Sequence, residues 1–435
     1  MNRLIMKALV DWKTSANRKP LILKGARQVG KTWLLKEFGR LHFENVAYIN
    51  FDNNEYMKNL FDGDYNINRL IEGLQVESNI MIAPEKTLII FDEIQEVTKA
   101  LSSLKYFYEK APEYAIVAAG SLLGVSLHEG LSFPVGKVNF MNLFPMNFYE
   151  FLDAINETKL LNLLEKNDWP LIHAFSNKFI ECLRKYYVVG GMPEAVYAYA
   201  QTNNYKEVRT IQQEILTAYE QDFSKHAPAN MVPKIRNVWN SIPVHLSKEN
   251  KRFTPGEVKK NSRLSEYETA LQWLFDAGLI YKIMQITKPE MPLKSYETDF
   301  FKVFIHDVGL LNCMAGLDVS LILEKNKLFT EFKGSLTEQY VLQELIASGI
   351  YPNYWSSRGR AEIDFIINLR NNIIPIEVKA EENLQSKSLK IYNEKYAPSH
   401  CWRISMSNFR EESWLVSIPL YAVRKIINAY DKHST

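Results

Sequence analysis

The apolar residues of the N-terminal part fall into short continuous runs, separated by segments in which apolar residues recur every three or four positions. We expect strands at residues 21–24, 45–52, 87–93, 114–121 and 138–143. Continuous apolar runs are typical of parallel strands buried on both faces. The segments at 3–16 and 67–80 have the spacing of amphipathic helices, which would pack on such a sheet. The pattern therefore predicts an α/β fold with a parallel sheet over residues 1–150.

The pattern becomes mainly helical after residue 150. Gly190–Pro193 interrupts the helical pattern of residues 151–225 and predicts a tight turn, for which helix packing is a better explanation than contact with a phosphate. Residues 230–290 follow the order helix, helix, helix and hairpin, which is the outline of a winged helix. Its expected recognition helix at 265–275 is acidic, which suits a DNA groove poorly. We therefore place a structural or protein-contact role ahead of base reading there.

Four domains follow from this pattern in a chain of 435 residues. The predicted architecture is a P-loop sheet of the AAA type, a helical lid, a winged-helix-like domain and a C-terminal α/β domain that resembles restriction endonucleases. The corresponding ranges are 1–150, 151–228, 229–325 and 326–435.

Composition adds limits on location and partners. The chain is 46% hydrophobic and 23% charged, and its formal net charge is only +2, so a nucleic-acid-binding surface would have to be local. Cys182, Cys313 and Cys401 are scattered and lack the spacing of metal ligands, which fits a reducing compartment. Neither a membrane-spanning run nor a secretory leader is recognisable. We predict a cytoplasmic protein without a membrane partner.

The most informative stretch lies between the first strand and the next helix. It reads Gly25-Ala26-Arg27-Gln28-Val29-Gly30-Lys31-Thr32, the pattern G-x-x-x-x-G-K-T. Its glycines let backbone N–H groups curl around an anion, and the following helix directs its positive end to the same point. Lys31 would reach the β and γ phosphates, and the Thr32 hydroxyl would bind Mg²⁺. We expect these eight residues to bind ATP.

Two carboxylates lie at the end of the strand at 87–93. Ligands bind at the carboxyl ends of strands in open α/β sheets, so Asp92 is expected to hold Mg²⁺ and Glu93 to orient the water that attacks the γ-phosphate. An acidic turn after a core strand is the alternative, but the phosphate loop upstream favours the functional interpretation. Ser121, at the end of another strand, is expected to sense the γ-phosphate or the attacking water, to cap a helix, or to do both.

Residues 24–32, 90–95 and 119–122 resemble the bacterial and archaeal AAA-superclass ATPases that carry a C-terminal domain of unassigned function. Tyr187–Val196 is similar to the mid-chain signature of that family, and the resemblance spans nearly the whole chain. It implies a helical lid over the nucleotide. The family usually has Gly-Arg before the strand at 138, where this chain has Gly136 and Lys137. The lysine ammonium is a point charge and lacks the planar, two-pronged hydrogen bonding of an arginine guanidinium. Which cation completes the ATP site stays open among candidates that include Arg184, Lys185 and Arg209.

A second group of reactive residues lies in the C-terminal part. Asp364 begins one predicted strand, and Glu377 and Lys379 alternate to one face of the next, so the three can converge at one end of a hairpin. With Glu338 on the preceding helix they resemble the PD-(D/E)xK nuclease core. Carboxylate oxygens of Glu338, Asp364 and Glu377 would bind Mg²⁺, and Lys379 would lie beside the attacking water or the scissile phosphate.

Two alternatives to a nuclease site stay open. Glu377 and Lys379 can form an ion pair on a solvated hairpin, or the fold can bind without cutting. Nearby cations that could hold a phosphate backbone are Lys387, Lys390, Arg358 and Arg360.

Two hypotheses of function follow. In the first, a Mg²⁺-dependent ATPase couples its nucleotide state to a nuclease-like, DNA-associated domain. In the second, the protein is an ATP-dependent switch or scaffold whose C-terminal domain binds protein or nucleic acid without cleavage. Self-association or a protein partner is compatible with both.

Overall fold

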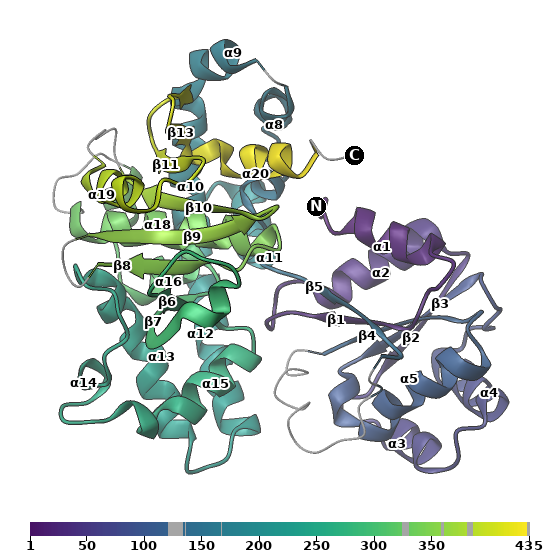
Figure 1. The fold of residues 1–435 in the computed structure, drawn as a ribbon. Coiled ribbons are helices and arrows are strands. Elements are labelled where there is room, and N and C mark those ends of the chain that lie inside the picture. The colour runs from purple at the N-terminus through teal and green to yellow at the C-terminus, as the bar shows by residue number, and fades with distance from the viewer. Residues whose placement is uncertain are drawn as a thin grey trace. The chain divides into compact units, whose positions relative to one another are not determined.

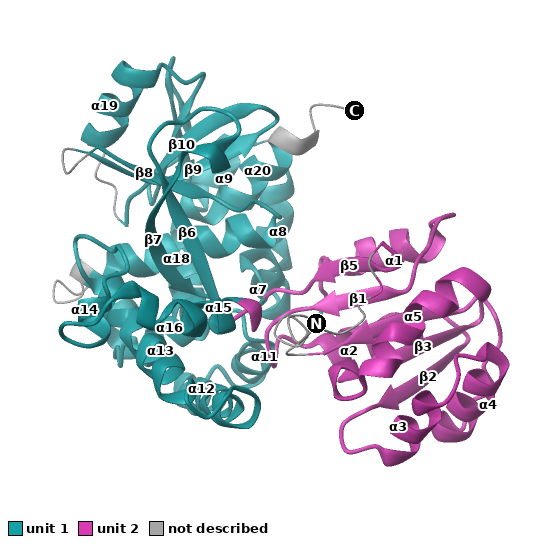
Figure 2. Cartoon of the chain, turned by 60° about the horizontal axis from the view of Figure 1, so that its bottom comes forward, with its two compact units in different colours: residues 1, 145–275, 280–435 teal, residues 2–144, 276–279 magenta. Residues whose placement is uncertain are grey.

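The computed structural model describes residues 1–120, 134, 136–166, 168–323, 330–357, 361–380 and 386–432. The chain forms two compact units, shown in two colours in Figure 2. The smaller contains residues 2–144 and 276–279. The larger contains residue 1, residues 145–275 and residues 280–435.

The smaller unit is built on a parallel sheet in the order β2-β3-β4-β1-β5, visible in Figure 1. Its strands are β1 (Leu21–Lys24), β2 (Asn45–Asn50), β3 (Thr87–Asp92), β4 (Ala115–Ala119) and β5 (Asn139–Asn142). Every pairing is parallel. The predicted α/β fold with a parallel sheet is confirmed.

Helices cover both faces of this sheet (Figure 1). They are α1 (Met6–Thr14), α2 (Lys31–His42), α3 (Glu55–Asp62), α4 (Ile67–Ser78) and α5 (Thr98–Lys110), with the short 3-10 helix η1 (Ile94–Glu96) after β3. Apolar side chains of α3, α4 and α5, such as Phe61, Leu74 and Leu104, pack on Ile89 and Phe91 of β3 in one buried cluster. This burial holds the carboxyl ends of the strands in place beside the phosphate loop. Helix α3 is an element that the apolar pattern did not indicate.

The larger unit begins with helices. They are α7 (Phe148–Ala154), α8 (Thr158–Glu165), α9 (Trp169–Ala174), α10 (Ser176–Val189), α11 (Pro193–Thr202), α12 (Tyr205–His226), α13 (Val232–Ser247), α14 (Pro255–Val258), η2 (Leu264–Glu266) and α15 (Glu268–Asp276). Further along the chain follow η3 (Leu293–Tyr296), α16 (Val308–Met314), α17 (Val319–Leu323), α18 (Thr330–Ala347), α19 (Lys387–Tyr396), η5 (Leu420–Ala422) and α20 (Val423–Lys432).

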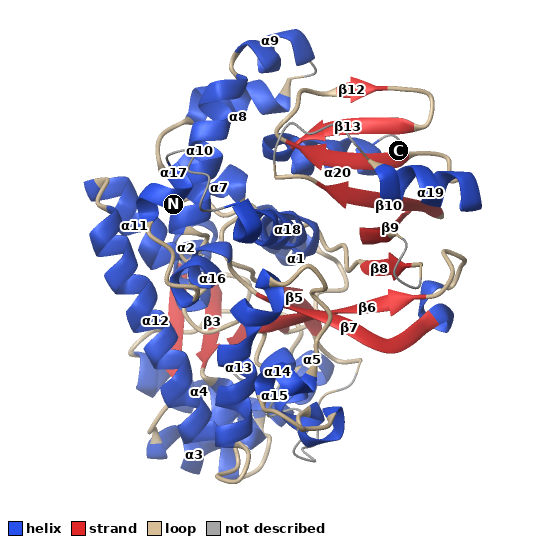
Figure 3. Cartoon of the chain, turned by 90° about the vertical axis from the view of Figure 1, so that its left-hand side faces the viewer, coloured by secondary structure: helices blue, strands red, loops and turns tan. Residues whose placement is uncertain are grey.

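The strands of the larger unit form one mixed sheet in the order β12-β13-β11-β10-β9-β8-β6-β7 (Figure 3). They are β6 (Ile280–Ile286), β7 (Glu297–Ile305), β8 (Asn353–Ser356), β9 (Glu362–Leu369), β10 (Asn372–Val378), β11 (Cys401–Ser405), β12 (Arg410–Glu411) and β13 (Leu415–Pro419). Helices α18 and α19 both pack on β10.

The hairpin expected as the wing of a winged helix is β6–β7, and it belongs to this sheet. Strand β6 pairs in parallel with β8, so Gln285 lies beside Tyr354. The expected recognition helix begins as the 3-10 turn η2 and continues as α15. The predicted boundary between residues 325 and 326 therefore separates strands of a single sheet. The winged helix and the division into four domains stay predictions.

The predicted turn at residues 190–193 is tightly packed within the larger unit. Gly190 has a φ of +74°, and a Cβ atom there would lie 2.3 Å from Oδ1 of Asp307. A Cβ atom on Gly191 would lie 2.1 Å from the carbonyl oxygen of Met146. The Gly191 N–H donates to Oδ2 of Asp307 at 2.6 Å, and the Met146 N–H donates to the Gly191 carbonyl at 2.6 Å. These contacts give both glycines a packing role.

Buried Glu344 of α18 makes stability dependent on pH. Its Oε1 accepts the Phe148 N–H at 2.8 Å, and burial raises its pKa from 4.5 to about 7. The folded protein therefore binds this proton more tightly than the unfolded chain, so stability is lost as pH rises from about 4.5 to 7. The difference in pKa corresponds to about 3 kcal/mol.

We expect Glu344→Gln to remove this pH dependence, because glutamine keeps the acceptor but cannot ionise. The stability of the variant relative to the natural protein should rise by up to about 3 kcal/mol between pH 4.5 and pH 7.5. Urea unfolding at several pH values measures the difference. The exposed Glu394→Gln on α19 is the control. Parallel pH curves for all three proteins would contradict the prediction.

Candidate functional site

The phosphate loop lies between β1 and α2, as predicted. A Cβ atom on Gly25 would lie 2.3 Å from the Leu143 carbonyl oxygen, so only glycine lets the loop approach the segment after β5. Gly30 has a φ of +90° and stands at the N-cap of α2. Helix α2 begins at Lys31, so its unpaired N–H groups and positive end point into the loop.

The Lys31 side chain is folded back on this loop. Its Nζ donates to the carbonyl oxygens of Gly25 and Ala26, both at 2.8 Å. Burial lowers the pKa of Lys31 to about 8, although Glu93 and Asp92 act in the opposite direction. A buried ammonium that donates to neutral carbonyl oxygens gains strongly from an anion. Lys31 is thus positioned to exchange these carbonyls for phosphate oxygens.

Thr32 and Asp92, the two residues of the smaller unit that were predicted to bind magnesium, are in contact. Thr32 Oγ1 donates to Asp92 Oδ2 at 2.7 Å, and the second carboxylate oxygen accepts the Glu93 N–H at 3.2 Å. Asp92 is buried at the end of β3. A hydroxyl and a carboxylate oxygen this close suit the oxygen-rich coordination of Mg²⁺, so the residues present fit the ion.

Glu93 lies next to Asp92 and has a φ of +50°, in the left-handed region that side chains other than glycine seldom adopt. Its Oε2 accepts a hydrogen bond from Gln95 Nε2 at 2.6 Å. Unusual backbone angles of this kind occur often at functional sites. The Glu93 side chain therefore leaves the chain from an unusual backbone conformation directly after β3.

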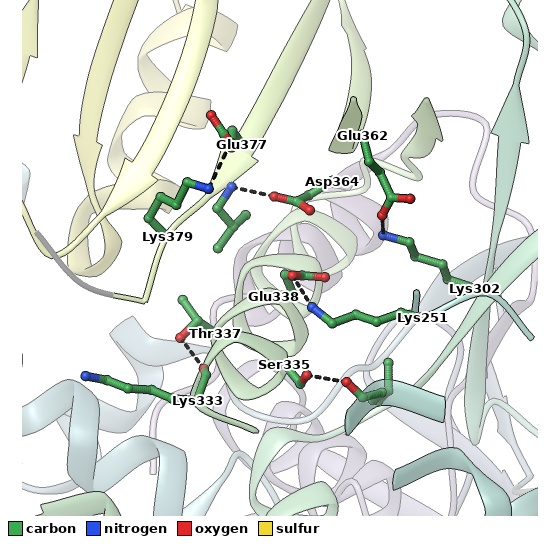
Figure 4. Close-up of polar contacts among 12 residues, drawn as sticks. Lys251, Lys302, Lys333, Ser335, Thr337, Glu338, Glu362, Asp364, Glu377 and Lys379 are labelled. Carbon is green, nitrogen blue, oxygen red and sulfur yellow. Dashed lines mark hydrogen bonds and ion pairs between the residues drawn. The ribbon is translucent and has the colours of Figure 1, made fainter. Parts of the chain in front are cut away.

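A second candidate site lies in the larger unit, in a cleft of about 1380 Å³. Its lining includes the four residues predicted from the sequence, Glu338, Asp364, Glu377 and Lys379. They come from α18, β9, β10 and the residue that follows β10 (Figure 4). The structure thus brings together side chains from three elements that the sequence pattern predicted to converge.

Asp364 is half-buried in the lining of this cleft. Its Oδ2 accepts the Val378 N–H at 2.8 Å. This bond lies just past the last paired residues of β9 and β10, Phe365 and Ile376. Burial raises the pKa of Asp364 to about 7, and the negative charge of Glu338 adds to the effect.

Glu377 and Lys379 form the ion pair that the sequence suggested as an alternative to catalysis. Lys379 Nζ lies 2.9 Å from Glu377 Oε1, with the carboxylate buried and the lysine about one-third exposed. In the part of the chain that the structure describes, Glu377 Oε2 is buried and has no hydrogen-bond partner. This oxygen could therefore still accept a hydrogen bond or bind a cation.

Glu338 is paired with Lys251, a residue that sequence reasoning missed. Although burial raises the pKa of Glu338, the charges of Lys251 and Lys302 outweigh this effect and lower it below its ordinary value. Lys302 Nζ forms an ion pair with Glu362 at 2.5 Å. No local pattern links Lys251 to Glu338, because 87 positions separate them in the chain.

Within the described ranges, no three His, Cys, Asp or Glu side chains are gathered as ligands of one ion. In the cleft, Glu338 and Glu377 are each paired with a lysine, yet Oε2 of each is buried without a hydrogen-bond partner among the described residues. Buried carboxylate oxygens of this kind fit a cation. The donor set therefore suits Mg²⁺, while its present pairing is with lysines.

The predicted phosphate-binding cations lie partly outside the described residues. Lys387 and Lys390 are exposed on α19, whose Ser388 and Lys395 line the cleft. Arg358 and Arg360 fall in a range that the structure does not describe.

Family comparison assigns the smaller unit. Residues 17–152 match the family model described as "AAA domain". This part of the chain is an AAA domain. The match covers the phosphate loop, Asp92 and Glu93. Residues 180–321 and 333–421 match two further models, each described as a domain of unknown function (DUF8612 and DUF4143).

Solved structures with some similarity include a Walker-type ATPase of Pyrococcus abyssi, at 15% identity over 72% of this chain and 95% of that chain, with a TM-score of 0.44. The Orc1 protein of Aeropyrum pernix in complex with DNA is 12% identical over 72% and 90%, with a TM-score of 0.27. AMPPCP-bound DnaA of Aquifex aeolicus is 13% identical over 63% and 86%, with a TM-score of 0.28. Likenesses of this size assign no function to this chain.

Among curated proteins, none matches the chain. The described part of the structure contains no helix that is both long enough and apolar enough to cross a membrane.

Two residues of the smaller unit that support the site were not predicted. Arg3 is buried, and its guanidinium donates to the carbonyl oxygens of Val29 at 3.1 Å and Phe144 at 2.6 Å, so it braces the phosphate loop. Tyr48 on β2 donates to Asp92 Oδ2 at 2.9 Å, and burial raises its pKa. Only the alignment of β2 with β3 identifies Tyr48, and that register is not evident from the sequence.

Other expectations for the AAA domain have mixed outcomes. Ser121 lies outside the described residues, so its role stays a prediction. Lys137 forms a surface ion pair with Glu109 at 3.0 Å. In the larger unit, Arg209 donates to Asn312 at 3.2 Å and to the Leu317 carbonyl at 3.0 Å, so its guanidinium serves packing within that unit.

Proposed function

We propose that this protein binds and hydrolyses ATP, and that its nucleotide state controls a nuclease-like, DNA-associated domain at the C-terminal end. The contact between Thr32 and Asp92 beside the buried ammonium of Lys31 carries the first part. Lys31 supplies a cation for the phosphates, and Thr32 and Asp92 supply two oxygens for a metal ion. The elements β1, β3 and α2 bring these groups together.

The residues of the AAA domain have separate roles in this proposal. Backbone N–H groups of residues 25–30 and the ammonium of Lys31 hold the phosphates. Thr32 and Asp92 would hold Mg²⁺, which neutralises charge on the β- and γ-phosphates when bound. Glu93 orients a water molecule toward the γ-phosphate and accepts its proton.

The C-terminal part of the proposal depends on the acidic cleft. Asp364, Glu377 and Glu338 would hold Mg²⁺, which lowers the pKa of a water molecule when bound. Lys379 would stabilise negative charge on a phosphodiester. The surrounding lysines support an anionic ligand, and the low net charge of the chain agrees with such a local surface. The nucleotide state would act by shifting the population of cleft conformations.

A nicking assay on supercoiled plasmid with Mg²⁺ or Mn²⁺ tests the cleft. We expect metal-dependent nicking by the natural protein and a loss of about 100-fold or more in Glu377→Ala and Lys379→Ala, because each change removes several kcal/mol of charge stabilisation. Glu411→Ala, which alters an exposed carboxylate on β12, is the control and should nick normally. Nicking that persists in both cleft variants would argue for a contaminating nuclease and against this site.

A switch or scaffold without cleavage is the second candidate. The observation in its favour is that Glu338 and Glu377 each form an ion pair with a lysine. In this case the cleft would bind protein or nucleic acid, or a second copy of the chain. Intact ATP turnover with no nicking in either metal would support this candidate.

A further inference from the structure

The segment 249–252 follows α13 and contributes Lys251 to the cleft. Backbone contacts at residues 252 and 253 attach it to β7. The Phe253 N–H donates to the Phe301 carbonyl at 2.8 Å, and the backbones of Arg252 and Lys302 form an isolated antiparallel β-bridge. The Phe253 ring stacks between His245 and Phe301 at centroid distances of 4.7 Å and 5.4 Å. Lys251 therefore extends into the cleft from an anchored backbone.

The ion pair that Lys251 forms with Glu338 is almost completely buried. The lysine side chain is 14% exposed and the glutamate side chain 8%. Charges buried to this degree interact more strongly than on the surface, and either one left alone is strongly disfavoured. Loss of Lys251 without a replacement cation would therefore disfavour the ionised form of Glu338.

The cation beside Glu338 need not be a lysine. Among the described residues, Oε2 of Glu338 and Oε2 of Glu377 have no hydrogen-bond partners although both are buried, so each carboxylate has unused capacity as an acceptor. Lys251 lies below Asp364 in the view of Figure 4, on the Glu338 side of the cleft. An ammonium and a divalent cation held by the same carboxylate would compete, because both need its negative charge.

We propose that Lys251 is a resident cation of the cleft, which a divalent cation must displace from Glu338 before it can bind Glu338, Asp364 and Glu377 together. This rests on the proposed metal-binding role of the cleft. An anionic ligand such as a phosphodiester offers Lys251 another partner, so its arrival would release Glu338 for the metal. Metal binding and substrate binding would then favour each other.

Binding of Mn²⁺, followed by electron paramagnetic resonance without nucleotide, tests the proposal on the full-length protein. We expect Lys251→Met to bind Mn²⁺ about tenfold more tightly than the natural protein, because a competing charge is removed. Lys248→Met, which removes a surface lysine paired with Glu257 in the same region, should leave the affinity unchanged. A short DNA duplex should tighten Mn²⁺ binding to the natural protein but not to Lys251→Met.

A second variant guards against misfolding, since methionine leaves Glu338 without its partner. Lys251→Gln keeps a hydrogen-bond donor without the charge and should show the same gain in affinity. In a Glu338→Gln background, Lys251→Met should have no effect on Mn²⁺ affinity.

Two results would overturn the proposal. Equal Mn²⁺ affinity in the natural protein and both Lys251 variants, with binding lost in Asp364→Asn, would show that the cleft binds metal without competition from Lys251. If Asp364→Asn changes Mn²⁺ binding in neither the natural protein nor the Lys251 variants, the metal-binding role of the cleft fails as well.

Discussion

Lys31→Ala is expected to abolish ATP binding, with an affinity loss of about 100-fold or more. Among the described residues, the buried ammonium donates to two carbonyl oxygens, and phosphate oxygens would replace them. Removing one member of a buried, charge-assisted pair typically costs several kcal/mol, which corresponds to a loss of this size. Titration with a fluorescent ATP analogue measures the effect.

Lys99→Ala is the matched control for this change. Lys99 also belongs to the AAA domain, but it lies half-exposed beside Asp62 at 3.3 Å. Surface pairs of this kind contribute little. The control should therefore bind ATP normally. Unchanged ATP affinity in Lys31→Ala would remove the basis for placing the phosphates in this loop.

Glu93→Gln is expected to separate binding from turnover. Glutamine has nearly the same size and can keep the hydrogen bond to Gln95 after its amide reorients, so ATP should still bind. It cannot accept a proton from water, and general bases typically contribute 10²–10⁴-fold to the rate. We expect phosphate release at saturating ATP to fall about 100-fold or more.

Glu96→Gln is the control for this change, because it makes the same substitution at an exposed position three residues further along. Phosphate release should be normal in that variant. A Glu93→Gln protein that hydrolyses ATP at the natural rate would show that another group activates the water. Loss of both ATP binding and turnover would point to damage at neighbouring Asp92.

Local sequence patterns were sufficient for the parts of the fold in which the relevant contacts are local. The phosphate loop follows one strand and precedes one helix, so Gly25, Gly30 and Lys31 could be placed without knowing the rest of the sheet. Glu377 and Lys379 were placed on one face of a strand because side chains alternate there. The order of strands and the sharing of one sheet by β6 and β8 required long-range pairing, which periodicity does not encode.

The residues missed at both sites have a common cause. Tyr48 meets Asp92 through strand register, Arg3 reaches the phosphate loop from the chain start, and Lys251 meets Glu338 across two elements. Each is a polar residue of a type that is common on protein surfaces, and its own segment contains no motif that marks it as part of a site. Its partner is defined by tertiary packing alone, so neither composition nor spacing could identify it.

Helix α18 is fastened to several parts of the larger unit by polar side chains. Gln339 donates to the Ile305 carbonyl at 2.6 Å, Tyr340 to the Leu420 carbonyl at 3.0 Å, and Glu344 accepts the Phe148 N–H. Such bonds are directional, so α18 cannot turn about its axis without breaking several of them together. Phe148 follows shortly after β5, the last strand of the AAA domain. A displacement of that stretch of chain would act on α18 at Glu344, which is six residues from Glu338 in the same helix.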